Sequence, residues 1–175
     1  MAAIVDQIEK SGPGDAVAGQ HVFAKANCAS CHRVGNQGLA GGTDLTDMAS
    51  RFSLREIVKS TIDPSAVVSK RHYLKEILTV DGIVHQGMEI AQADGSYVLL
   101  NQQGKRIRVD ASEVQKTGSR RNSVMPEGLL DDLSTTEIRD LMAYLTKQSN
   151  STLADGQSQP PAARIGAMPA VQEVR

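Results

Sequence analysis

The two cysteines of the chain lie together as Cys28-Ala29-Ser30-Cys31, and His32 follows at once. Three chemistries use such a pair. A thioredoxin-like redox site places it at the start of a helix that follows a strand. A tetrahedral zinc site needs four ligands, usually with a second Cys or His pair at short spacing. Covalent haem attachment has Cys-x-x-Cys-His as its sequence signature.

The surroundings favour haem attachment, because the pair follows an expected helix and the other histidines lack zinc-ligand spacing; these are His21, His72 and His85. Two thioether bonds would hold the porphyrin edge and place His32 at an axial position of the iron. We therefore expect one covalent haem c per chain, attached through Cys28 and Cys31. The thiol and zinc alternatives stay open on these residues alone.

A methionine or a second histidine would complete the iron coordination. Met125 lies in an expected loop, and Pro126 beside it fixes the backbone of an irregular segment. Core filling is the commoner role of a methionine, but this loop is a poor place for it. We therefore predict Met125 as the second axial ligand. The weaker candidates are Met48, Met88, His72 and His85.

Three stretches carry the i, i+3, i+4, i+7 pattern of amphipathic helices. They contain Gly19-Val22-Phe23-Ala26, Leu54-Ile57-Val58-Thr61 and Ile138-Leu141-Met142-Leu145. Asp15 is an expected N-cap, and Ser53 with Glu56 and Ser134 with Glu137 form capping boxes. Asp63-Pro64 should end the second helix. The glycine-rich residues 35–42 read as a loop.

Residues of about 72–118 change to an alternating pattern, clearest in Arg106-Ile107-Arg108-Val109-Asp110. Turn signals separate the runs at Asp81-Gly82, Asp94-Gly95 and Gln103-Gly104. This region is therefore expected to form four or five antiparallel strands. The predicted fold class is mainly α, a helical haem domain with an inserted small β-sheet.

The chain has 175 residues, a formal net charge of −1 and only 3% aromatic residues. The near-zero charge argues against nucleic acid as a partner, and no apolar run approaches the ~18 residues of a membrane span. A core so poor in aromatics would gain bulk from a buried porphyrin. We expect a linker at 1–14, one domain at 15–147 and a disordered tail or linker at 148–175.

Together, Cys28–His32, the segment Ser123-Val124-Met125-Pro126-Glu127-Gly128-Leu129-Leu130 and the last helix resemble a class I cytochrome c. More narrowly, they resemble the haem-binding cytochrome c domain of planctomycetes and verrucomicrobia, which joins the two motifs across a β segment. The resemblance implies that Gly19 and Phe23 cross the last helix at Tyr144. Class I cytochromes usually have Gly-Pro-x-Leu where this chain has Gly42-Thr43-Asp44-Leu45. The Thr43 carbonyl would then accept the proximal histidine's N–H.

The resemblance implies an electron carrier rather than an enzyme, exchanging single electrons with a dehydrogenase or reductase and with another cytochrome or oxidase. Two alternatives are a haem sensor or peroxidase-like enzyme with a displaceable Met125, and an interaction module built on the sheet. Lys116, Arg120 and Arg121 are either solvated or a docking patch for an acidic partner. Bacterial haem c attachment occurs outside the cytoplasmic membrane, so a periplasmic location is expected, although Met1–Lys10 shows no secretory signal pattern.

Overall fold

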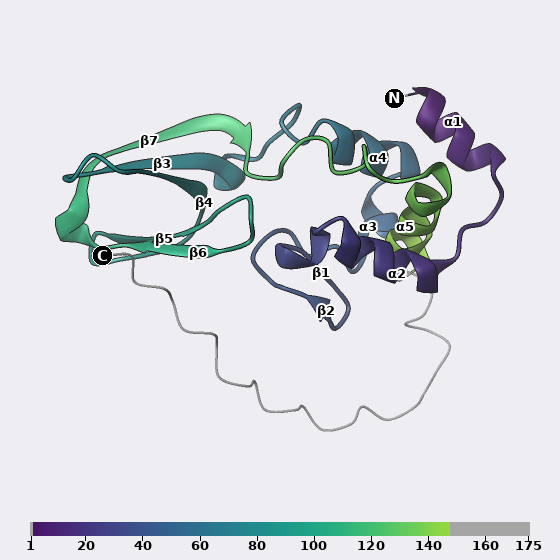
Figure 1. Ribbon diagram of the computed structural model, residues 1–175, viewed down its shortest axis with the longest axis horizontal. Helices are drawn as coiled ribbons and strands as arrows, with labels where there is room; N and C mark the ends of the chain where they lie inside the picture. The colour runs from purple at the N-terminus through teal and green to yellow at the C-terminus, as the bar shows by residue number, and fades with distance from the viewer. Residues whose placement is uncertain (1, 148–175) are drawn as a thin grey trace, which may run out of the picture.

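The computed structural model describes residues 2–147, which form a helical part and a sheet that lie side by side (Figure 1). The helices are α1 (Ala2–Lys10), α2 (Ala16–Lys25), α3 (Met48–Arg51), α4 (Leu54–Ile62) and α5 (Thr135–Lys147). The strands are β1 (Arg33–Val34), β2 (Gln37–Gly38), β3 (Tyr73–Thr79), β4 (Val84–Ala93), β5 (Ser96–Leu100), β6 (Arg106–Val109) and β7 (Val114–Ser123).

The helical part is organised around the crossing of α2 and α5. A Cβ on Gly19 would lie 1.9 Å from the carbonyl oxygen of Asp140, so only glycine allows the two backbones this approach. One turn further on, the rings of Phe23 and Tyr144 meet with centroids 5.5 Å apart. The crossing implied by the family resemblance is therefore present in the structure.

The predicted caps are confirmed. Asp15 accepts hydrogen bonds from the N–H groups of Val17 and Ala18 at the start of α2. Ser53 and Glu56 form a complete capping box, and Asp63 is the C-cap of α4. Ser134 and Glu137 bond reciprocally before α5, with Ser134 N donating to Glu137 Oε2 at 2.9 Å. Local sequence signals therefore set the starts of these three helices.

The linker predicted for residues 1–14 was wrong for most of its length, because Ala2–Lys10 form α1. Val5 and Ile8, one turn apart, are buried in the same core as Phe23 and Leu141. A short helix with no N-cap signal gains its stability from this tertiary burial. Residues 148–175, the predicted tail, lie outside the described residues.

The five strands β3–β7 form one antiparallel sheet in the order β6-β5-β4-β3-β7. It is curled, with β3 and β7 on one side and β5 and β6 on the other (Figure 1). Ile77, Leu99 and Val109 form an apolar core of the sheet's own. The last strand reaches Ser123, beyond the expected limit near residue 118, because β7 pairs with β3 as far as Tyr73.

The mainly-α fold class is corrected by these strands. The structure contains 36% helix and 28% strand, with the five-stranded antiparallel sheet as a second structural part. A further hairpin pairs β1 with β2, and β2 lies within the stretch 35–42 that was expected to be loop. Among residues 2–147, no helix is long and apolar enough to cross a membrane.

Gly19→Ala should destabilise the protein by about 3 kcal/mol, the upper end of the usual cost of overpacking, because the added Cβ meets backbone that cannot yield. The free energy of unfolding, measured with urea, tests this. Gly118→Ala is the matched control, since nothing lies within 4 Å of a Cβ there. Equal stability of the two variants would contradict the close crossing.

Glu137 links α5 to α2 through Lys25, and that contact together with the bonds from Ser134 lowers its pKa to about 2. The unfolded value is about 4.3, so the stabilisation is complete above that pH and is lost as pH falls toward about 2. The stability difference between the parent protein and Glu137→Gln should therefore shrink between about pH 6 and about pH 3. Urea unfolding across this range measures it, and a pH-independent difference would contradict the assignment.

Candidate functional site

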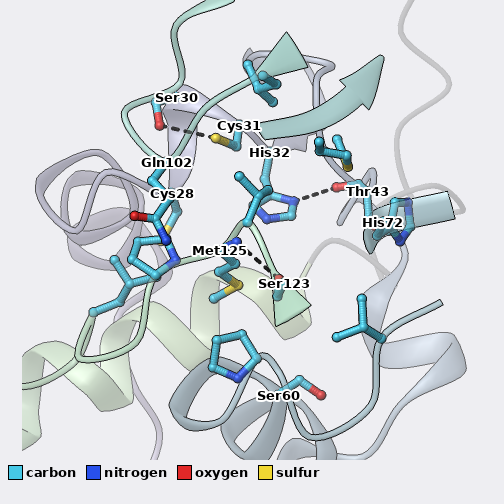
Figure 2. Close-up of a pocket in the computed structure, with 18 of the residues that line it drawn as sticks. Cys28, Ser30, Cys31, His32, Thr43, Ser60, His72, Gln102, Ser123 and Met125 are labelled. Atoms are coloured by element: carbon cyan, nitrogen blue, oxygen red, sulfur yellow. Dashed lines mark hydrogen bonds between the residues drawn. The ribbon is translucent and has the colours of Figure 1, made fainter. Parts of the chain in front are cut away.

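The predicted site residues surround one pocket between the helical part and the sheet. Cys28, Cys31, His32 and Met125 all line it, and Figure 2 shows them drawn around the same space. Its empty volume is about 950 Å³ with the solvent at its mouth included. The fold thus brings together the cysteine motif and Met125, which lie far apart in the sequence.

The cysteine pair lies on a tight turn that directly follows α2. Asn27 adopts a left-handed conformation with φ of 59°, and Cys28–Ser30 form a single 3-10 turn. The carbonyl of Cys28 accepts the N–H groups of both Cys31 and His32, at 3.2 and 2.9 Å. This turn places both thiols and the imidazole at the pocket.

Burial raises the pKa of the Cys28 thiol to about 11. A redox-active thiol needs the opposite shift, toward the thiolate, and the described residues before the turn, 2–27, contain no strand. Residues 2–147 also contain no group of three or more His, Cys, Asp or Glu side chains that could hold a metal ion. The site therefore differs from both a thioredoxin-like centre and a zinc centre.

His32 is held by the carbonyl of Thr43, whose oxygen accepts from Nδ1 at 2.7 Å. The same bond is drawn in Figure 2. Burial lowers the pKa of the imidazole, and the Thr43 carbonyl opposes that shift. A neutral ring with Nδ1 protonated leaves Nε2 as the nitrogen able to bind a metal.

Gly42 lets the loop after the hairpin lie against the His32 ring. A Cβ at this position would approach Cε1 of His32 to 2.9 Å and Nδ1 to 3.1 Å. The N–H of Gly42 donates to the carbonyl of Cys31 at 2.6 Å, so the loop is bonded to the motif it covers. A glycine is therefore required at position 42, because the loop backbone lies so close to the His32 ring.

Met125 lies in an irregular segment between β7 and α5, as predicted. Its N–H donates to Ser123 Oγ at 3.0 Å, and the N–H of Ser123 in turn donates to Ser65 Oγ at 3.2 Å. Gly128, at φ of 75°, turns the chain toward α5. The two bonds fix the backbone that leads into a partly buried methionine.

The sheet forms one wall of the pocket, which the sequence did not indicate. Leu100 and Met88 are buried with Val124, and Cys31 packs against this cluster. A Cβ on Gly104, in the β5–β6 turn, would lie 2.7 Å from the Cβ of Ser30 inside the cysteine motif. Strand residues thus contribute the apolar lining. In the sequence, the only sign of these residues was the alternation of apolar and polar side chains along the strands.

Of the four weaker ligand candidates, two lie away from the pocket and two line it. Met48 packs against the helical core, and His85 pairs with Ile77 in the sheet. Met88 and His72 line the same pocket as Met125, Met88 from β4 and His72 from the turn before β3.

The residues present fit a porphyrin: two thiols at one edge, an oriented imidazole, a thioether from another segment and an apolar wall. Residues 16–76 match the family model described as cytochrome c. That stretch includes the cysteine motif and Thr43, and it ends within β3. No curated protein matches the chain.

Residues 16–76 therefore match a c-type cytochrome domain, which is characteristic of haem-binding electron-transfer proteins. Its cofactor is covalently bound haem c. Domains of this family are typically extracytoplasmic.

Leu100→Ala should open the sheet wall of the pocket to water and lower the reduction potential, since solvent exposure around a haem favours the charged ferric state. Leu99→Ala is the matched control, because Leu99 is equally buried but lies in the sheet's separate core. Each substitution should cost about 2–5 kcal/mol of stability. Potentiometric titration distinguishes the two variants by their reduction potentials. Equal reduction potentials would contradict the role of the sheet wall.

Proposed function

We propose that the chain is a monohaem cytochrome that carries single electrons by outer-sphere transfer, with His32 and Met125 as the axial ligands. Cys28 and Cys31 are the proposed thioether attachment points. The observation that carries this proposal is that all four side chains line one pocket although they come from two segments far apart in the sequence.

Bound haem c supplies a reversible one-electron couple between ferrous and ferric iron. The protein's residues determine the rest. His32, held through Nδ1 by Thr43, and Met125, held through its backbone by Ser123, would occupy both axial positions. No position would then be left for a substrate, which is why we propose a carrier rather than an enzyme.

The apolar wall from Leu100, Met88 and Val124 excludes water from one side of the proposed haem site. Burial of this kind raises the potential, as does a thioether ligand, which favours the softer ferrous iron. The proposed carrier would therefore accept electrons from a dehydrogenase or reductase and deliver them to another cytochrome or an oxidase.

Two finer assignments accompany the proposal. The continuous path from the cysteine motif through the sheet to Met125-Pro126-Glu127-Gly128-Leu129 supports kinship with the planctomycete and verrucomicrobial haem-binding domain. Covalent haem attachment in bacteria supports location in the periplasm or an equivalent compartment.

The basic residues before Met125 offer weaker support for a docking patch. Lys116, Arg120 and Arg121 are exposed on β7, but Arg120 pairs with Glu76 at 2.8 Å. That pairing removes one of the three charges from the proposed surface, so steering of an acidic partner would depend on Lys116 and Arg121.

Met125→Ala should abolish the weak far-red charge-transfer band that marks methionine sulfur on ferric haem c. It should also lower the reduction potential and allow carbon monoxide to bind the ferrous protein, because one axial position is freed. Visible spectra of the matured protein in both oxidation states and with carbon monoxide, together with a potentiometric titration, measure the three effects.

Met88→Leu is the matched control, since Met88 lines the same pocket but is assigned to the sheet wall. It should keep the band. A band that survives in Met125→Ala, or tight binding of carbon monoxide by the unsubstituted protein, would contradict His32/Met125 coordination.

A further inference from the structure

The loop that carries the Thr43 carbonyl lacks the proline expected from the family resemblance, yet it is fixed by a second contact one residue further on. His32 donates through Nδ1 to Thr43 O at 2.7 Å. The next residue on each segment, Arg33 and Asp44, forms an ion pair, with Arg33 Nε 3.0 Å from Asp44 Oδ2. The hydrogen bond and the ion pair are thus adjacent links between the same two segments.

Both carboxylate oxygens of Asp44 accept hydrogen bonds, one from Arg33 and the other from Thr46. Arg33 donates to Oδ2 through Nε and also through Nη2. Thr46 donates to Oδ1 through its N–H at 2.9 Å and also through its hydroxyl. Hydrogen bonds from Thr46 and then Arg33 hold the pKa of Asp44 far below its ordinary value, so the carboxylate stays charged. Two N–H groups of one guanidinium on the same carboxylate oxygen restrict the orientation of Arg33 as well as its distance.

Three further hydrogen bonds surround the ion pair, and the first two of them join the same two segments. Leu45 N donates to the carbonyl of Arg33 at 2.8 Å. Gly35 N donates to Thr46 Oγ1 at 2.9 Å. Arg51 Nη2 donates to the carbonyl of Asp44 at 3.1 Å. Because Gly42 N also donates to the carbonyl of Cys31, the Thr43 carbonyl lies in a loop that is bonded to the histidine segment on both sides.

We propose that Asp44, held by Arg33 and Thr46, is a positioning residue that keeps the Thr43 carbonyl within hydrogen-bond distance of His32 Nδ1. It thereby sets the electron-donating strength of the axial imidazole. It substitutes for the rigidity of the proline that Thr43 replaces. This inference rests on the proposed function, because it takes His32 as an axial ligand.

The expected direction follows from ligand chemistry. A firm hydrogen bond from Nδ1 makes the imidazole a stronger donor, which favours ferric iron and lowers the potential. Loosening the loop should weaken that bond. Asp44→Asn should therefore shift the reduction potential to a more positive value.

The experiment uses the matured holoprotein with labelled histidine. In the ferrous state, the solvent exchange of the His32 Nδ1 proton is measured by nitrogen NMR alongside the reduction potential. Asp44→Asn should exchange roughly two- to fivefold faster, the size expected from losing one exposed ion pair, and its potential should rise.

Asp6→Asn is the matched control, because Asp6 forms an exposed ion pair with Arg55 in the helical part, at 3.4 Å. It should change neither quantity. Thr43→Pro supplies a second variant: in its background, Asp44→Asn should have a smaller effect on both quantities, because the ring restores rigidity by itself.

Asp44→Asn with unchanged exchange and unchanged potential, in a protein whose His32 ligates iron, would overturn the inference and leave the proposed function intact. An unsubstituted protein in which His32 does not bind iron would contradict both. A loss of stability in Asp44→Asn without a change in potential would assign Asp44 a purely structural role and also overturn the inference.

Discussion

The close crossing of α2 and α5 at Gly19 is the contact on which the rest of the structure depends. The chain passes from α2 directly into the turn that holds Cys28 and His32, and it enters α5 from the segment that holds Met125. Fixing the two helices against each other therefore fixes the two halves of the site. The buried carboxylate of Asp140 secures the same crossing by accepting the N–H of Asp15 at 2.9 Å.

The helical part and the sheet have different roles at the site. The helical part and its loops supply the groups proposed to bind the haem. The sheet supplies the apolar wall through Leu100 and Met88 on one face, while Leu99 and Ile77 on the other face hold the sheet itself together. This division accounts for a chain that is so poor in aromatic side chains. Its helical core relies on the Phe23–Tyr144 pair, and the pocket has an aliphatic lining.

Local signals in the sequence predicted much of this fold. The capping boxes and the Asp15 cap mark helix starts because their hydrogen bonds are made within a few residues. The His32–Thr43 contact was expected from the family resemblance and is present at 2.7 Å. What the sequence could not reveal depends on distant contacts. The helix α1 is stable because Val5 and Ile8 are buried by other helices, and the polar end of β7 is a strand because β3 pairs with it.

The sheet's share of the pocket was also invisible in the sequence. Alternation predicted a strand at Leu99 and Leu100, but it did not say which face would meet the cysteine motif. The Arg33–Asp44 clamp was missed for a related reason, since neither residue carries a motif of its own. The available signal was that they directly follow His32 and Thr43.

The proposed coordination by His32 and Met125 is the central claim, and near-infrared magnetic circular dichroism of the ferric holoprotein tests it most directly. This measurement distinguishes the low-spin charge-transfer bands of histidine–methionine, bis-histidine and open high-spin haem. A single histidine–methionine signature is the predicted result. A bis-histidine signature, which would point to His72 at the same pocket, or a high-spin signature would contradict it.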